Sequence, residues 1–195
     1  ANIHYIRQQE MRGLGHAISC AKSFVGDDPF VVLYADDVIL GDVPAAKELV
    51  EAYEQYGLPC CAIKEVPKQE LYRYSSLKVD KLSGSMYKVT DMVEKPATEK
   101  DAFSCFSILG RVLLTSEVFD LLEKTKPGAG GEIQLTDAMA CLARGNGMIG
   151  VDFSGTRYDM GSKLGIIKAN IEIGLKHEET SDGLKEYIKE IAAKL

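Results

Sequence analysis

Apolar residues recur along this chain in two spacings, and the alternation of the two predicts strands separated by helices. The clearest strand signal is residues 30–34, five apolar or aromatic residues that predict a strand buried on both faces of a parallel sheet. Residues 76–79 and 86–89 flank a turn-forming segment and predict an antiparallel hairpin. Further apolar runs predict strands at residues 3–6, 60–63, 103–114 (interrupted at Gly110) and 148–153.

Other segments place apolar residues three and four positions apart, the spacing of an amphipathic helix. Residues 43–56 show this spacing, and Gly57 follows at the position where helices commonly end. Ser116 is placed to cap a helix that runs to about residue 124. Ser162 is placed to cap another helix, with Leu164, Ile167, Ile171 and Leu175 on one face. The same spacing predicts helices at residues 17–23, 132–142 and 184–195.

This order of elements predicts an α/β protein. We expect a Rossmann-like mixed, mostly parallel sheet flanked by helices, with the hairpin as an inserted region that covers a ligand. The chain contains no internal repeat and no low-complexity tract, so residues 1–195 are expected to form one domain. For the amphipathic helix at residues 184–195, packing against the core is favoured over dimerisation, and a homo-oligomer stays open.

Composition narrows the classes of function. With 46% hydrophobic and 27% charged residues, the chain has the balance of a soluble globular protein. A net charge of −6 gives no reason to expect nucleic acid as a partner, and no apolar run approaches the roughly 20 residues that cross a bilayer. The five cysteines are odd in number and include no Cys-x-x-Cys, which favours buried free thiols in a reducing cytoplasm over disulfides or zinc.

Two adjacent carboxylates, Asp36 and Asp37, follow the strand predicted at residues 30–34. Ligands of open parallel α/β sheets bind beyond the carboxyl ends of the strands. Neighbouring carboxylates in that place repel each other unless a cation lies between them, and Mg²⁺ is a hard cation that fits the requirement. The alternative, that one aspartate only caps the next turn, is equally favoured by the pair alone.

Further candidates lie at turns. Gly13 and Gly15 precede a predicted helix, where glycine lets a ligand approach the backbone, although a tight turn without a ligand explains the spacing as well. Glu94 and Lys95 precede Pro96, which keeps them extended, so their side chains should project in opposite directions; a solvated ion pair is the alternative. Neither a G-x-G-x-x-G fingerprint nor a Walker loop occurs, which argues against a Rossmann dehydrogenase.

Several short motifs follow one another in the order of a known family. They are Arg7-Gln8, Gly13-Leu-Gly-His-Ala17, Ala35-Asp-Asp37, Val93-Glu-Lys-Pro96, Gly110-Arg111, Pro127-Gly-Ala-Gly-Gly-Glu-Ile-Gln-Leu-Thr-Asp-Ala138 and Asp159-Met-Gly-Ser-Lys-Leu-Gly165. Each motif alone is weak evidence for a family. The Gly-Glu-Ile-Gln-Leu-Thr-Asp-Ala block is specific when it occurs together with the other motifs. Over nearly its full length, the chain resembles the bacterial UTP–glucose-1-phosphate uridylyltransferases.

The resemblance implies a reaction and its catalytic residues. The reaction is Mg²⁺-dependent transfer of UMP from UTP to glucose 1-phosphate, which gives UDP-glucose and pyrophosphate. Asp36 and Asp159 match the two carboxylates that hold Mg²⁺ in the family, and Lys95 matches the lysine that contacts the sugar phosphate. A cation and a lysine between two reacting anions would lower both their repulsion and the charge of the transition state.

The resemblance also implies how the substrates bind. Gln8 and Gly13 match the residues that recognise the edge of the uracil, and Glu94 matches the acid that hydrogen-bonds the glucose hydroxyls. Gly110 is expected near the sugar pocket. The chain departs from the family at Ser75, where the family usually has a glycine beside the sugar.

A second departure concerns the N-terminal part of the family pattern. The family begins with a glycine-rich loop, Gly-x-Gly-Thr-Arg-x-x-Pro-x-Thr-Lys, that surrounds the triphosphate, and this sequence has no such motif. We therefore expect an N-terminally truncated domain with little or no turnover of its own. Two alternatives stay open: a non-catalytic module that binds sugar nucleotides, and a related nucleotidyltransferase that uses another nucleotide.

Overall fold

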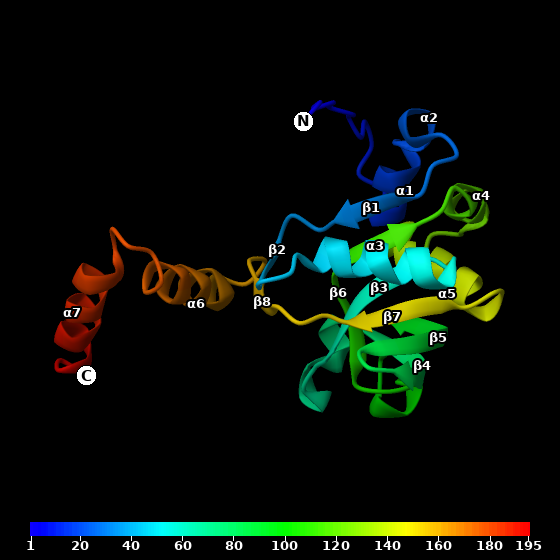
Figure 1. The fold of residues 1–195 in the computed structure, drawn as a ribbon. Coiled ribbons are helices and arrows are strands. Elements are labelled where there is room, and N and C mark those ends of the chain that lie inside the picture. Colours follow the sequence, from blue (N-terminus) through cyan, green and yellow to red (C-terminus); the bar gives the residue numbers. More distant parts are fainter.

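The fold is that of a computed structural model, which describes residues 1–195 apart from the side chain of Ala129 (Figure 1). Its strands are β1 (Phe30–Leu33), β2 (Asp37–Leu40), β3 (Cys60–Glu65), β4 (Ser75–Ser83), β5 (Met86–Glu94), β6 (Phe106–Leu114), β7 (Met148–Asp152) and β8 (Thr156–Asp159). Its α-helices are α1 (Leu14–Ser19), α2 (Lys22–Val25), α3 (Ala45–Tyr56), α4 (Glu117–Lys124), α5 (Leu135–Arg144), α6 (Lys163–Gly174) and α7 (Ser181–Ala192). Three short 3₁₀ helices are η1 (Lys68–Arg73), η2 (Glu99–Asp101) and η3 (Ala129–Gly131).

The main sheet confirms the α/β class and corrects the predicted direction of its strands. Its order is β1-β6-β3-β7-β5-β4. Only β3 and β7 pair in parallel, whereas β6 and β5 run against their neighbours, so the remaining pairings are antiparallel. Sequence pattern could not show this, because a strand buried on both faces has the same composition in either direction.

Strand β3 is the strand that is buried on both faces. Its successive side chains alternate between two apolar clusters: Cys61 and Ile63 face one cluster, and Cys60 and Ala62 face the other. Helices α1, α4 and α5 cover the first cluster, and α3 covers the second. Figure 1 shows α3 lying across one face of the sheet.

Strand β1 does not have the two-sided burial that its composition predicts. It lies at the edge of the sheet and pairs only with β6, so its residues are half-buried and Leu33 is 57% exposed. The strand predicted at residues 3–6 is wrong, because the structure places these residues in an irregular segment with Ile3 72% exposed. An apolar run without a neighbouring strand has no ladder to pair its backbone groups.

Most other predicted elements form. The hairpin is β4 and β5, which pair antiparallel and turn at Gly84. Helix α3 ends at Gly57, whose left-handed conformation (φ 65°, ψ 20°) suits glycine. Ser162 caps α6 by accepting a hydrogen bond from the Gly165 N–H at 2.9 Å, as predicted, whereas Ser116 makes no side-chain cap.

Helices α6 and α7 form an arm that extends away from the sheet, with the C-terminus at its far end (Figure 1). The arm is joined to the body through a second, two-stranded sheet of β2 and β8. No residue of α7 is buried, and Tyr187 is 59% exposed. The expectation that residues 184–195 pack on the core is therefore wrong, because the connection through β8 carries this stripe beyond the reach of the sheet.

Candidate functional site

A polar cavity of about 380 Å³ lies where β2, β5, β8 and the start of α5 meet. Four of the predicted residues line it: Asp36, Glu94, Lys95 and Asp159. The structure therefore brings together carboxylates that are more than 120 positions apart in the sequence. The lining also includes apolar and aromatic side chains, namely Leu14, Tyr34, Ile108 and Leu135.

Asp36 and Asp159 converge beside Gly161. A methyl group placed on Gly161 would lie 3.3 Å from Asp36 Oδ2 and 3.2 Å from Asp159 Oδ1, so the two oxygens are at most roughly 6.5 Å apart, the sum of these distances. The backbone holds this arrangement: Met160 N–H donates to the Asp36 carbonyl at 2.7 Å, and Gly161 N–H donates to Asp159 Oδ1 at 3.0 Å. Glycine at position 161 leaves the space between the carboxylates open.

Asp37, the neighbour of Asp36, has a different environment. It stands opposite Asp159 in the register of β2 and β8, but only 7% of it is exposed and its carboxylate pairs with Arg157. Burial raises the pKa of Asp37 above its usual range, and the hydrogen bond from Arg157 opposes this shift. Both aspartates line the cavity, but Asp36 is exposed, whereas Asp37 is buried and paired with Arg157. The role of Asp36 as a ligand of a cation stays a prediction.

Gly110 lies beneath Asp37 and does not line the cavity. Its φ of 71° is in the left-handed region, and a methyl group there would overlap Cβ of Asp37. Close packing under Asp37 thus accounts for glycine at this position. The role near the sugar that the resemblance implies for Gly110 stays a prediction.

Glu94 and Lys95 do not project in opposite directions. Lys95 Nζ lies 3.9 Å from Glu94 Oε1, because the left-handed backbone of Lys95 (φ 45°) breaks the alternation of an extended chain. The carboxylate of Glu94 also accepts a hydrogen bond from Thr136 Oγ1 at 2.7 Å, which ties the end of β5 to α5. Both charged groups still face the cavity, so they can contact one ligand.

Gln8 and Gly13 lie together on the N-terminal segment, next to the cavity rather than in its wall. Gln8 Nε2 donates to the Gly13 carbonyl at 3.2 Å and lies 2.9 Å from His16 Nδ1. A methyl group on Gly13 (φ 96°) would lie 2.7 Å from Glu132 Cβ, so glycine lets this segment dock against the residues before α5. Their predicted contact with uracil stays a prediction.

Sequence reasoning missed Arg157 and Arg73, and it noted Tyr74 only as the residue before Ser75, not for its contact with a carboxylate. Arg157 donates to the Tyr74 hydroxyl at 3.3 Å, Tyr74 in turn donates to Asp159 Oδ2 at 3.3 Å, and Arg73 lies 3.5 Å from the same oxygen. The spacing Arg157-x-Asp159 on a short strand was the available signal, because alternate residues of a strand share a face. Arg73 and Tyr74 gave no such signal, because they lie at the end of the 3₁₀ helix η1 and directly after it.

Asp36 and Asp159 both supply carboxylate oxygens, the type of ligand that Mg²⁺ prefers. Mg²⁺ is commonly held by one or two carboxylates, and substrate phosphates and water complete its octahedron. Among the described residues, no group of three or more histidines, cysteines, aspartates or glutamates is arranged to hold a metal. Lys95 is one of the cationic residues that line the same cavity and is available for an anionic group of a ligand.

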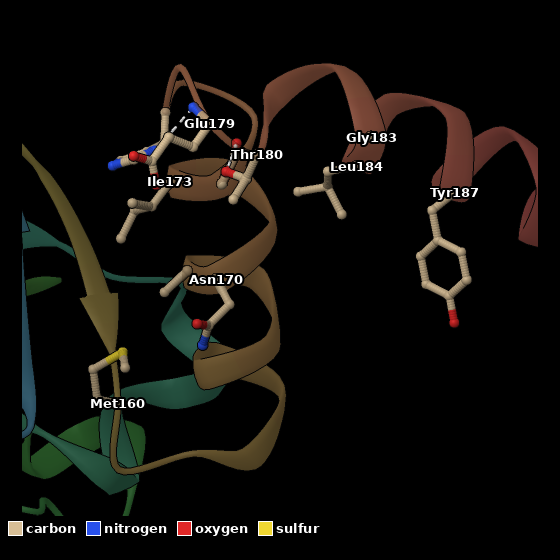
Figure 2. A pocket seen from close by; sticks show the side chains of 11 residues that line it. Met160, Asn170, Ile173, Glu179, Thr180, Gly183, Leu184 and Tyr187 are labelled. Carbon is tan, nitrogen blue, oxygen red and sulfur yellow. Dashed lines mark hydrogen bonds between the residues drawn. The ribbon is translucent and has the colours of Figure 1, made fainter.

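A larger cavity of about 720 Å³ lies in the arm, between α6 and α7 (Figure 2). Figure 2 shows Leu184 and Tyr187 on α7 and Ile173 on α6 among its lining residues. Its walls are mainly apolar and lack a pair of converging carboxylates, so the smaller cavity is the candidate site.

Among the described helices, none has both the length and the apolar character needed to cross a bilayer.

Known proteins are similar to this chain in both sequence and fold. The UTP–glucose-1-phosphate uridylyltransferase of Staphylococcus epidermidis is 46% identical over 191 residues, which cover 98% of this chain and 66% of that protein. A crystal structure of UDP-glucose pyrophosphorylase complexed with UDP-glucose superposes with a TM-score of 0.85 at 39% identity, covering 89% of this chain and 66% of that one. A UTP-bound UDP-glucose pyrophosphorylase from Acinetobacter baumannii gives a TM-score of 0.84 at 32% identity, covering 95% and 64%.

The chain spans slightly less than two thirds of the length of these curated relatives. The sequence pattern of the family described as nucleotidyl transferase matches residues 1–174, which include all the candidate site residues and α6. Fold, motif order and family pattern thus agree: the chain belongs to the nucleotidyl transferase family.

Proposed function

We propose that this chain acts as a UTP–glucose-1-phosphate uridylyltransferase. The reaction is the Mg²⁺-dependent transfer of UMP from UTP to glucose 1-phosphate, with pyrophosphate as the second product. The observation that supports it most is the convergence of Asp36 and Asp159 beside Gly161, in a cavity that also holds Lys95. Relatives whose names give this activity, and a related structure complexed with UDP-glucose, support the same assignment.

The proposed chemistry needs no covalent intermediate with the protein. An oxygen of glucose 1-phosphate attacks the α-phosphorus of UTP, the bond to the pyrophosphate breaks, and the electron pair leaves with the pyrophosphate. A bound Mg²⁺ would supply positive charge where the two anions meet. The protein's share is mainly to position the reacting groups, which can account for a large part of the acceleration.

Each candidate residue has a role in this proposal. Asp36 and Asp159 hold the cation, and Lys95 contacts the phosphate of the sugar. Glu94 accepts hydrogen bonds from the glucose hydroxyls, in an orientation that Thr136 maintains through its 2.7 Å bond. The substrate contacts of Gln8, Gly13 and Gly110 follow the resemblance: uracil for the first two, the sugar for the third.

Ser75 lines the cavity, where the family usually has glycine. Its hydroxyl accepts a hydrogen bond from the Ile108 N–H at 3.1 Å, and its backbone carbonyl accepts one from the Ser107 hydroxyl. Both contacts are made within the protein, on the side of β6. We infer that the side chain is turned toward β6 and leaves room for the sugar.

We also propose that two copies associate through the arm, in the reducing environment of the cytoplasm. The arm carries both halves of a self-complementary contact, the apolar cavity between its helices and the exposed apolar side chains of Leu164, Ile167, Tyr187 and Ile191. A two-fold contact needs one surface patch that is complementary to itself.

The cysteines are consistent with the reducing environment of the cytoplasm. Cys60 and Cys61 are both free thiols and both buried.

The test is calorimetric titration of the protein with UDP-glucose, with and without Mg²⁺, and with ADP-glucose and dTDP-glucose as competitors for the site. We expect UDP-glucose to bind most tightly and Mg²⁺ to strengthen its binding. Asp36→Ala should abolish the effect of Mg²⁺, whereas Asp152→Ala, a carboxylate on β7 that pairs with Lys64 outside the cavity, should leave it intact. Equal affinity for the three sugar nucleotides would overturn the uridylyl assignment, and an unchanged Mg²⁺ effect in Asp36→Ala would overturn the metal site.

A further inference from the structure

A third carboxylate, Asp37, lines the same cavity as Asp36 and Asp159, the two carboxylates of the proposed cation site. Asp36 and Asp37 are consecutive, and Asp37 is paired with Asp159 in the register of β2 and β8. Residues that face each other across an antiparallel pair project from the same face, with Cβ atoms about 5 Å apart. The Cβ atoms of Asp37 and Asp159 are therefore neighbours. A divalent cation at the site would attract both of these carboxylates as well as that of Asp36.

Arg157 decides where the third carboxylate goes. It lies two residues before Asp159 on β8, so the two side chains share a face, and Asp37 is the diagonal neighbour of Arg157 across the pair. The guanidinium is mostly buried, with 16% of its side chain exposed, and binds Asp37 through Nε and Tyr74 through Nη1. Gly110 leaves room for Asp37 in this position, because a methyl group on Gly110 would overlap Cβ of Asp37 and lie 2.9 Å from its Oδ2.

We propose that Arg157 withholds Asp37 from the cation, so that the site offers two carboxylates instead of three. This inference rests on the proposed function, because it assumes the cation site of Asp36 and Asp159. Withholding the third carboxylate limits how tightly the ion is held by the protein alone and leaves positions for substrate phosphates and water. It also favours Mg²⁺, which is bound through one or two carboxylates, over Ca²⁺, which takes 6–8 oxygen ligands.

Arg157 is thus a positioning residue. It touches neither the cation nor the substrate in this proposal, and it acts through Asp37 on one side and through Tyr74 and Asp159 on the other. A purely structural ion pair would make a different prediction. Its removal would lower the stability of the protein without raising the affinity of the site for any cation.

The test measures Mn²⁺ binding through the electron paramagnetic resonance signal of the free ion, with Ca²⁺ as competitor and no nucleotide present. We expect Arg157→Gln to bind Mn²⁺ at least ten-fold more tightly than the unmodified protein and to lose discrimination against Ca²⁺. Arg157→Lys, which keeps the charge, should stay close to the unmodified protein. The double variant Arg157→Gln/Asp37→Asn should return to the original affinity, because the released carboxylate is then absent.

Asp37→Asn alone keeps the test informative if Arg157→Gln fails to fold. Because Asp37 is withheld, its neutralisation should change the Mn²⁺ affinity less than two-fold, whereas Asp36→Asn and Asp159→Asn should each lose most of the binding. A loss in Asp37→Asn equal to that in Asp36→Asn would overturn the proposal, as would a folded Arg157→Gln that binds no more tightly. If Asp36→Asn and Asp159→Asn bind normally, the cation site of the proposed function fails instead.

Discussion

The candidate site and the arm are joined in the chain, yet their side chains are held in opposite ways. Around the site, polar residues bind one another over long sequence distances: Asp37 on β2 with Arg157 on β8, and Glu94 on β5 with Thr136 on α5. In the arm, the contacts are local: Lys185 pairs with Asp182, Lys194 pairs with Glu190, and Thr180 bonds the Gly174 carbonyl to fix the corner between the helices.

The difference shows what each region depends on. The site is an outcome of the whole fold, because its residues meet only when the sheet and its connections have formed. The arm is determined mainly by helix capping and helix propensity, and its apolar face has few partners among the described residues. The same substitution should therefore have different consequences in the two regions.

The largest contrast is expected from truncating an aromatic side chain. Phe119 is 1% exposed and stacks on Phe30 with ring centroids 5.3 Å apart, so Phe119→Ala should lower the free energy of unfolding by about 3–5 kcal/mol. Tyr187→Ala in the arm is the matched control and should change it by no more than about 0.5 kcal/mol in the monomer. Urea unfolding measures both, and similar losses would show that the arm is buried in solution.

Glycine-to-alanine substitutions should have opposite signs in the two regions. Gly110→Ala introduces a methyl group against Asp37 at a positive φ, which should cost about 2–4 kcal/mol from overpacking and backbone strain together. Gly183→Ala lies within α7, where an added methyl group meets no atom within 4 Å, and should stabilise the protein by about 0.5–1 kcal/mol. Thermal unfolding of the two variants gives the comparison, and a destabilising Gly183→Ala would contradict the open surroundings of α7.

Charged residues placed on the arm should affect association and leave the fold intact. Tyr187→Lys combined with Ile191→Lys should weaken the proposed dimer at least ten-fold, equivalent to about 1.4 kcal/mol, because lysine does not enter an apolar contact favourably. Sedimentation equilibrium measures the dimer constant. Tyr72→Lys, at an exposed aromatic residue on the body, is the control, and an equal effect of this variant would place the interface elsewhere.

The smallest contrast concerns ion pairs and pH. Burial alone would raise the pKa of Asp91, but the hydrogen bonds from Arg144 at 2.9 Å and from its neighbour Met92 lower it below the usual value. A lowered folded-state pKa adds stability above the unfolded pKa of about 4, and this stability is lost as the pH falls through the folded value. Since Arg144 is half exposed, Arg144→Ala should cost no more than about 1 kcal/mol at pH 7 and less at pH 3.

The control for this pair is Lys185→Ala, which removes a local ion pair of the arm. It should cost only a few tenths of a kcal/mol, as is usual for exposed pairs within one helix. Unfolding free energies at pH 7 and pH 3 distinguish the two pairs. An equal loss in both variants at pH 7 would show that linking α5 to β5 adds nothing to the stability.

The periodicity of apolar residues predicted much of the fold, and the predictions that were wrong failed for physical reasons. Alternating and helical spacings predicted the hairpin, α3 and the cap at Ser162, because each depends on nearby residues. The direction of β6, the edge position of β1 and the exposure of α7 depend on what lies beside each element after folding. No local pattern carries that information.

The candidate site divides in the same manner. Asp36, Glu94, Lys95 and Asp159 were found through their motifs, and the structure brings these residues into one cavity. The burial and pairing of Asp37 could not be predicted from the sequence. They depend on Arg157 from a distant strand and on the lack of a side chain at Gly110. Two adjacent aspartates are chemically identical, so only tertiary contacts give them different environments.

The joint between β8 and α6 has a mechanical consequence. Asp159 is the last residue of β8, and the arm's first helix begins only four positions later, at Lys163. Within that link, Gly161 bonds the Asp159 carboxylate and Ser162 N–H bonds its carbonyl at 3.4 Å. A protein bound to the arm that changed its orientation would therefore also displace Asp159, a proposed ligand of the cation.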